Sequence, residues 1–305
     1  MKKTKDVKDF VDEYIEQLVG KTDKRTLKAY RCDLKHFAEN MANKSYINVE
    51  NVNAYIAGLY QTYKNISVKR KIASIRLFYK YLAQTDAVFE DVVSNINGCS
   101  DRFLPQYETA TLDEVKKIFQ KCNELYETAD TDFKEFIYIR NMVILQMLFS
   151  TGITAEELCG CKPTQVNLKE KTITLINEKK ERILSLENGF DIEILKLYMT
   201  KYKTEMDEGG YFILGRYNNK MDEQSIRRML AGLAEKAGIH RKITPSMLRN
   251  AFIDISLEMG TNAKLLKDVL GLDSYHVITN HQDRLKRMEE KKIVYNNPLT
   301  LINDK

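Results

Sequence analysis

The decapeptide ITPSMLRNAF, in the last quarter of the chain, holds the residues that are best spaced for chemistry. Thr244 and Pro245 predict a helix start, because a hydroxyl caps free amides and proline suits the first helical position. Ser246, Arg249 and Asn250 follow at i, i+3 and i+4, so they share one face of that helix. The guanidinium of Arg249 either contacts a phosphate or is buried against a carboxylate or a carbonyl, and the sequence leaves both open.

The cysteines are the next side chains that could do chemistry, and they are Cys32, Cys99, Cys122, Cys159 and Cys161. Their odd number and irregular spacing argue against a disulfide framework. Cys159 and Cys161 form a CGC triplet that suggests a metal, but no histidine or further cysteine pair lies nearby in sequence. We therefore predict buried or half-buried thiols, no metal site and no cofactor.

Helices with one apolar face are predicted to build the first part of the chain. Apolar residues recur every three or four positions over 4–20, about 24–43, about 49–63 and 67–82. On the last of these segments, the basic residues are predicted to point largely outward; they are Lys69, Arg70, Lys71 and Arg76. Four short helices with short connections predict a small helical bundle.

The second part of the chain mixes helices with one hairpin. Thr111 and Glu114 predict a capping box at its first helix, and a long apolar helix is expected over 136–149. The stretch KTITLINEKKERILSL alternates in polarity, which predicts strands over Thr172–Ile176 and Glu181–Leu186. The helical period then returns, with glycines at the expected helix ends: Gly238, Gly260 and Gly271.

Length and composition favour two domains. A chain of 305 residues is long for one core, and 43% hydrophobic with 30% charged residues is typical of a globular protein, here mostly helical. The periodicity fails in the turn-rich stretch NINGCSDRFLPQYE, which reads as a connection. We predict an N-terminal domain over 1–98, a linker over 99–108 and a C-terminal domain over 109–305.

The basic excess is confined to the first third of the chain. Residues 1–100 hold 17 Lys and Arg against 12 Asp and Glu, a net of +5, and residues 101–305 hold 31 of each, a net of zero. A basic module joined to a neutral one suggests contact with a polyanion, although a solvated helical surface would look the same. No apolar run approaches the roughly 20 residues of a membrane span, and no secretory signal is evident, so a cytoplasmic protein without membrane contact is expected.

Several stretches, in the right order along nearly the whole chain, resemble the tyrosine recombinase (phage integrase) family. They are TLKAYRCDLKHF (through Thr26, Tyr30, Asp33, Leu34 and Phe37), KRKIASIRLFYKYL, RNMVILQMLFSTGITAEELCG, KKERILSL, SIRRMLAGLAEKAGI followed by ITPSMLRNAF, and DVLGLDSYHVITNHQDRL. The resemblance implies a mostly α-helical fold with a small β-hairpin or sheet. It further implies an N-terminal helical-bundle, core-binding (SAM-like) domain and a C-terminal catalytic-type tyrosine recombinase domain.

The resemblance also implies a demanding set of catalytic side chains. In such enzymes a tyrosine hydroxyl attacks a DNA phosphodiester and forms a 3′-phosphotyrosine link. Two arginines neutralise the charge that grows on the non-bridging oxygens. A histidine assists proton transfer at the nucleophile, a hairpin lysine protonates the leaving 5′ oxygen, and a His or Trp donates a further hydrogen bond to the phosphate.

This chain departs from the family pattern at most of those positions, although the acidic neighbour of the first arginine is retained as Glu157. The equivalents are Thr154 for the first arginine, Lys179 or Lys180 for the hairpin lysine, Ser246 for the histidine, Arg249 for the second arginine, Leu272 for the His or Trp, and His281 for the nucleophile. Losing one phosphate donor costs roughly two to three decades in rate, and losing acid–base help roughly two to four. We therefore predict no intact catalytic site.

Loss of cleavage does not imply loss of binding, because phosphate contacts need only well-placed Lys, Arg and backbone donors. The family closes its two domains around duplex DNA, so each domain should supply such contacts, although each cluster could instead be a solvated helix face. The predicted DNA-binding residues are Arg25, Lys28, Arg31, Lys69, Arg70, Lys71, Arg76, Lys179, Lys180, Arg182, Arg227, Arg228, Arg241, Lys242 and Arg249.

The sequence thus predicts a DNA-binding member of this family that cannot cleave DNA and has an architectural or regulatory role, with double-stranded DNA as its partner. One alternative is an active recombinase that uses a displaced nucleophile, Tyr275 or Tyr295, or attack by His281 on phosphorus. Another is a protein-interaction module that has lost DNA binding. The charged tail, 283–305, docks either on a neighbouring protomer or related recombinase or on its own monomer.

Overall fold

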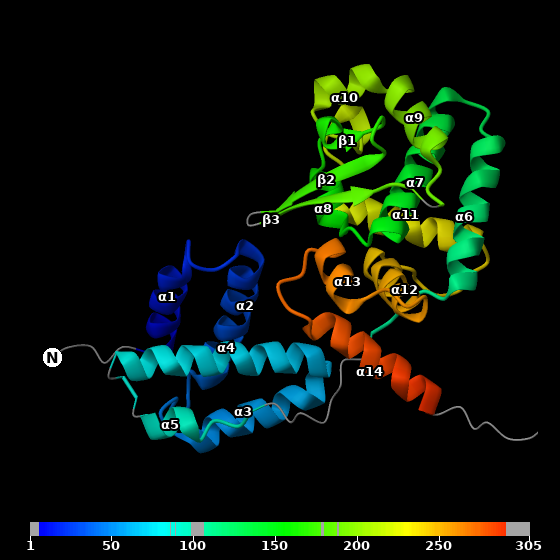
Figure 1. The fold of residues 1–305 in the computed structure, drawn as a ribbon. Coiled ribbons are helices and arrows are strands. Elements are labelled where there is room, and N and C mark those ends of the chain that lie inside the picture. The colour runs from blue at the N-terminus through cyan, green and yellow to red at the C-terminus, as the bar shows by residue number, and fades with distance from the viewer. Residues whose placement is uncertain are drawn as a thin grey trace, which may run out of the picture. The chain divides into compact units, whose positions relative to one another are not determined.

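The computed structural model describes residues 6–85, 87–88, 90–98, 107–177, 180–187 and 189–290. The chain divides between Pro105 and Gln106 into two compact units. Each unit has a buried apolar core of its own, and both are mostly helical, as predicted (Figure 1). The limits proposed for the domains themselves stay a prediction.

The first unit is a helical bundle. Its helices are α1 (Val7–Leu18), α2 (Lys24–Met41), α3 (Val49–Thr62), α4 (Asn65–Gln84) and the short α5 (Glu90–Ser94). Side-chain caps fix three of the helix starts, since Asp6, Asp23 and Asn48 each accept from backbone amides of the first turn. The four predicted helices are confirmed within a few residues at each end, and α5 was not predicted.

The prediction that Lys71 of α4 points outward is wrong. The Lys71 side chain is buried, with the residue only 6% exposed, and its Nζ lies 3.0 Å from Asp33 Oδ1. Arg70 pairs with the other oxygen of the same carboxylate. Asp33 is itself buried, and an ionised carboxylate without cations beside it would be costly to bury. The need to neutralise Asp33 therefore draws Lys71 inward.

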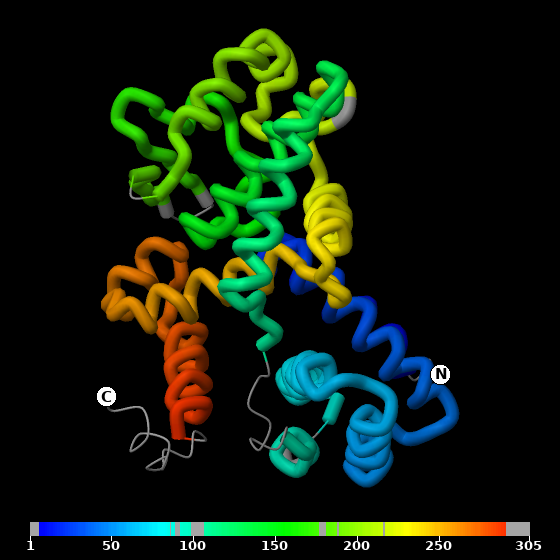
Figure 2. The backbone as a smooth tube through the Cα atoms, turned by 90° about the vertical axis from the view of Figure 1, so that its right-hand side faces the viewer, coloured from blue at the N-terminus to red at the C-terminus, as the bar shows by residue number. Residues whose placement is uncertain are grey.

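The second unit holds the remaining helices and one three-stranded antiparallel sheet. The helices are α6 (Leu112–Glu127), α7 (Asp132–Thr151), α8 (Ala155–Gly160), α9 (Ile192–Lys201), α10 (Lys203–Gly209), α11 (Glu223–Lys236), α12 (Pro245–Glu258), α13 (Ala263–Val269) and α14 (His276–Glu290), with 3₁₀ turns at Pro163–Gln165 and Arg216–Asn218. Helices α12 to α14 lie together at the end of the unit away from α9 and α10 (Figures 1 and 2). In the described part of the chain no helix is long and apolar enough to cross a membrane.

The sheet confirms the predicted hairpin and adds a short third strand. Its order is β1 (Val166–Asn167), β2 (Thr172–Asn177) and β3 (Lys180–Ser185). Leu175 pairs with Arg182, so both side chains point to the same face, and that face is buried. The register therefore turns the arginine of β3 toward the helices beneath the sheet.

A left-handed glycine ends the long helix α7. Gly152 has a φ of +61°, and a Cβ there would lie 2.7 Å from a ring carbon of Phe252. Only glycine combines this backbone conformation with such a close approach. The chain then turns directly into α8, which places Thr154 and Glu157 beside α12.

Candidate functional site

Helix α12 begins as the decapeptide predicts. The Thr244 hydroxyl accepts from the Met247 amide at 3.3 Å, and Pro245 is the first helical residue. Ser246 is exposed, whereas Arg249 and Asn250 are half-buried. The three side chains share a face but have different surroundings.

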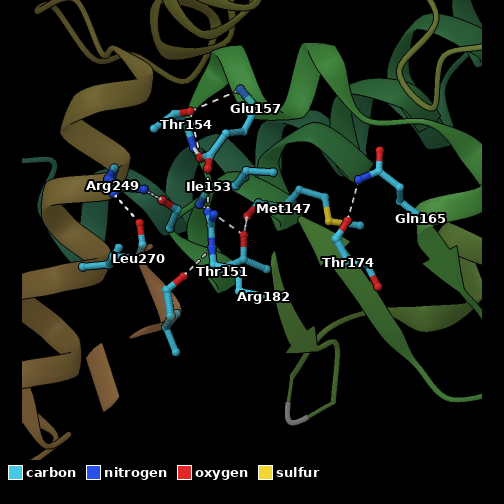
Figure 3. Close-up of polar contacts among 12 residues, drawn as sticks. Met147, Thr151, Ile153, Thr154, Glu157, Gln165, Thr174, Arg182, Arg249 and Leu270 are labelled. Atoms are coloured by element: carbon cyan, nitrogen blue, oxygen red, sulfur yellow. Dashed lines mark hydrogen bonds and ion pairs between the residues drawn. The ribbon is translucent and has the colours of Figure 1, made fainter. Parts of the chain in front are cut away.

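Arg249 is held by two backbone carbonyls. Its Nη1 donates to the carbonyl of Gly152, and its Nη2 donates to that of Leu270 at 3.1 Å (Figure 3). Burial lowers the pKa of Arg249 from the ordinary arginine value, while the nearby charge of Glu157 acts in the opposite direction and that of Arg182 adds to the lowering. Its guanidinium therefore ties together the end of α7, the end of α13 and α12.

Thr154 is the N-cap residue of α8. Its hydroxyl caps the helix, and Glu157 Oε2 accepts from the Thr154 amide at 3.0 Å and from the Thr154 hydroxyl at 2.9 Å (Figure 3). Burial alone would raise the pKa of Glu157, but the Thr154 amide and the charge of Arg182 outweigh it and hold this pKa below its usual range. Thr154 therefore carries no charge toward a phosphate and serves as a helix cap.

Arg182 is the cation that neutralises Glu157. Its Nη2 lies 2.8 Å from Glu157 Oε1, its side chain is only 8% exposed, and its Nε donates to the Val269 carbonyl at 3.0 Å. A Cβ at residue 271 would lie 2.8 Å from Arg182 Nη1, and Gly271 has a φ of +64°, so this position needs glycine. Arg182 was predicted to contact DNA from the hairpin, but the fold encloses its side chain.

His281, the residue predicted to stand at the nucleophile position, is enclosed as well. His281 is 0% exposed, and its Nδ1 lies 2.7 Å from Asp254 Oδ1. Arg284 Nη1 donates to the other oxygen of Asp254 at 2.5 Å. The ring of Tyr107 stacks on the imidazole with 4.6 Å between ring centroids and 2° between planes. The imidazole is thus fixed on one edge and covered on one face.

Leu272, which we predicted at the position of the family's His or Trp, packs against a small apolar cluster. The buried members of that cluster are Ile253, Leu266, Leu270 and Ile278. An alkyl side chain offers no hydrogen bond, so its role here is packing of α13 against α12 and α14.

Three residues of this site were not singled out from the sequence: Asp254, Arg284 and Tyr107. The first had a usable signal, because Asp254 is a lone carboxylate in the apolar run AFIDI, and a charge in such a run needs a partner. Arg284 follows His281 at i+3, so both reach the same carboxylate from one helix face. Tyr107 gave no signal, because its partner is far away in sequence.

The predicted DNA-binding residues fall into three groups. Some have exposed positions: Arg25, Lys28 and Arg31 on α2, Lys69 and Arg76 on α4, Arg227 and Arg228 on α11, and Lys242. Others are paired within the protein: Lys71, Arg182 and Arg249 are buried or half-buried, whereas Arg70 and Arg241 are exposed but bound to Asp33 and Glu114. Lys179 lies outside the described residues, and only the backbone of Lys180 is described.

The alternative nucleophiles and the cysteines have clear placements where the structure describes them. Tyr275 is 46% exposed, with Lys267 Nζ 5.4 Å from its ring centre, and Tyr295 lies outside the described residues. Cys159 and Cys161 are buried, and burial raises the pKa of the Cys161 thiol to about 12. Cys99 lies outside the described residues, and within the described ranges no three metal-ligating side chains gather.

Known families account for both units. The Phage integrase family matches residues 109–283, and the N-terminal SAM-like domain of phage integrases matches residues 11–86. The chain belongs to the phage integrase family. Arg249, Gly152 and the β2–β3 hairpin thus stand in the scaffold of a tyrosine recombinase, which confirms the resemblance drawn from the motifs.

Individual recombinases resemble this phage integrase homologue along most of their length. A tyrosine recombinase of Agathobacter rectalis is 29% identical over 291 residues, covering 94% of this chain and 95% of that protein. Tyrosine recombinase XerC of Staphylococcus saprophyticus is 24% identical, covering 89% and 92%. Lambda integrase residues 75–356 bound to DNA share the fold at a TM-score of 0.71 and 14% identity, covering 95% of this chain and all of that one.

Proposed function

We propose that this chain binds duplex DNA and does not cleave it. The observation that carries the proposal is the state of His281. The residue at the family's nucleophile position has no exposed surface, shares its Nδ1 edge with a buried carboxylate and lies under the Tyr107 ring. A nucleophile must reach the phosphorus in line, and nothing in these contacts presents His281 outward.

Three further positions support the loss of cleavage. Thr154 is used to cap α8, Leu272 has no hydrogen-bonding side chain, and Ser246 replaces a group that moves a proton. Arg249 remains, but both of its terminal nitrogens donate to carbonyls. A phosphate would have to compete for those donors, and it would find one arginine where the family pattern has two.

The first unit supports DNA binding. Its exposed basic positions lie on α2 and α4, which pack against each other. The net charge of +5 over residues 1–100 gives that unit a field that attracts a polyanion. Relatives of the same fold have been seen on DNA, among them lambda integrase on a core site and XerH on its substrate.

A cleavage assay tests the first half of the proposal. A duplex with a nick near the exchange point traps any covalent intermediate, because the released fragment diffuses away and religation fails. We expect no DNA–protein adduct on a denaturing gel. An adduct would overturn the proposal, and its loss in Tyr275→Phe or Tyr295→Phe would identify a displaced tyrosine, whereas its loss only in His281→Ala would identify a phosphohistidine.

Salt-dependent binding tests the second half. We expect measurable affinity for duplex DNA at low salt, with a negative slope of log affinity against log salt. Substituting both Lys69 and Arg76 by glutamine should reduce that slope by about 2, since each phosphate contact contributes about 0.9. Lys196→Gln on α9 is the matched control and should leave the slope unchanged. Absence of affinity at low salt, or of any slope, would leave a protein-interaction module instead.

The tail 283–305 belongs to a further proposal, in which it docks on a second copy of this chain when both occupy DNA. Structural relatives include a lambda integrase dimer on a core site. Mass measurement on DNA, with the full chain and with a chain ending at Glu290, tests this: equal masses per DNA would refute it.

A cytoplasmic location stays a prediction that imaging of the tagged chain would test.

A further inference from the structure

A four-residue segment at the entry of the second unit is fastened at each of its residues. We call Tyr107–Ala110 the entry segment; it follows the undescribed residues 99–106 and precedes α6. The Ala110 amide donates to the Met247 carbonyl at 3.3 Å. The Thr109 carbonyl accepts from Arg241 Nη2 at 2.8 Å.

The other two residues are held by side chains of α12 and α14. Asn250 Nδ2, on α12, donates to the Glu108 carbonyl at 2.9 Å. The ring of Tyr107 lies parallel on that of His281 at 4.6 Å. The Asn250 amide supplies the donor of one contact, and the buried His281 imidazole supplies the flat face of the other.

Helix α14 is fastened by the same cluster. Asp254, from α12, accepts from His281 and Arg284 of α14 through its two oxygens. The entry segment, α12 and α14 therefore share one set of polar and aromatic contacts, with the buried pair of His281 and Asp254 at its centre.

We propose that Asn250 and His281 form a latch that couples the entry segment to helix α14. The interdomain connection enters the second unit through Tyr107, and the tail leaves it through α14, so the latch joins the two ends of the unit. Release of the entry segment should then raise the opening equilibrium of α14 by some factor. Release of α14 should raise that of the entry segment by the same factor, because a coupling between two sites is reciprocal. The latch does not depend on DNA binding.

Amide hydrogen exchange of the full chain without DNA tests the latch. Tyr107→Leu removes the ring stack and should speed exchange at the Ala110 amide and in α14 by about 2- to 12-fold, the equivalent of one aromatic pair. His281→Ala should do the same at both places. His281→Phe keeps a ring for Tyr107 but loses the Asp254 bond, and should restore protection at Ala110 relative to His281→Ala.

The controls separate coupling from loss of stability. Amides in the buried part of α7, such as that of Leu145, should keep their wild-type exchange in Tyr107→Leu, and the distant exposed substitution Phe133→Leu should change neither reporter. Asn250→Ala, on the α12 side of the segment, should speed exchange at Ala110 if His281→Ala does not fold. An equal increase at all amides, or an increase confined to the substituted segment, would overturn the proposal.

Discussion

If the proposed correspondence of His281, Thr154, Ser246 and Leu272 to the family positions holds, His281→Tyr restores the nucleophile, and we expect the variant still not to cleave DNA. Thr154 and Leu272 each stand where a phosphate donor is missing, and one such donor is worth about 10²–10³ in rate. Ser246 stands where a proton-transfer group is missing, worth about 10²–10⁴. Taken as independent, the three losses multiply to a reaction about 10⁶ slower.

This loss in rate sets the fraction of protein that an assay should find joined to DNA. From a typical enzymatic turnover of about 10 s⁻¹, the rate would fall to about 10⁻⁵ s⁻¹ or below. Less than about 4% of the protein would then carry DNA after one hour with a nicked duplex. A denaturing gel with labelled DNA measures this fraction directly.

The matched control is His281→Phe, which has the same ring and no hydroxyl. Both variants should lose stability, because a larger ring in a fully enclosed site costs about 1–3 kcal/mol and the lost bond to Asp254 about 1–3 kcal/mol. Circular dichroism must therefore show a folded chain before the gel is interpreted. An adduct well above the expected fraction in His281→Tyr, absent in His281→Phe, would refute the reasoning that the other three positions have lost their chemistry.

Three further substitutions test the scaffold. Asp254→Ala should lower the free energy of unfolding in urea by about 3–5 kcal/mol, because it leaves the largely buried Arg284 guanidinium and the buried His281 Nδ1 without their acceptor; a loss too small to measure would contradict that role. Gly152→Ala should cost about 2–5 kcal/mol through backbone strain and overpacking, whereas Gly58→Ala, with open space around it, should be neutral or stabilising. The pKa of Glu114 is held at about 2, first by its hydrogen bond with Arg241. The contribution of this carboxylate to the free energy of unfolding is therefore complete above the ordinary pKa of 4.5 and is lost as the pH falls toward 2. After allowance for the half-exposed arginine this is about 1–2 kcal/mol, and Glu114→Gln should remove that part of the acid sensitivity; an unchanged profile would refute it.

Local patterns predicted the scaffold well because they depend on neighbours in sequence. The period of apolar residues placed α1 to α4, and the Thr-Pro start of α12 follows from capping chemistry alone. No periodic signal predicts α5, because five residues are too few to show a period. The helix ends moved by a few residues, as fraying ends do.

Non-local pairing explains what the sequence could not place. Lys71 was predicted outward because cations favour water, and only the fold shows that Asp33 of another helix requires it. Arg182 meets the Val269 carbonyl across 87 positions, and His281 meets Asp254 across 27. The sequence predicted Thr154, Leu272 and His281 as replacements of catalytic residues, but not their roles as cap, packing residue and stacking partner.

The neutral charge of residues 101–305 also has a structural consequence. Arg182, Arg241 and Arg249 are each engaged with carboxylates or carbonyls, so a phosphate oxygen would have to displace a partner and leave it unpaired, at about 1–3 kcal/mol each. Lys28 and Lys69 are exposed, with no ion pair to another described residue, so a phosphate there displaces mainly water and counterions. Removing charges on α2 and α4 should therefore lower mainly the affinity for DNA. Arg182→Gln should instead lower mainly the free energy of unfolding. The reverse pattern would mean that the arginines of the second unit exchange their internal partners for DNA.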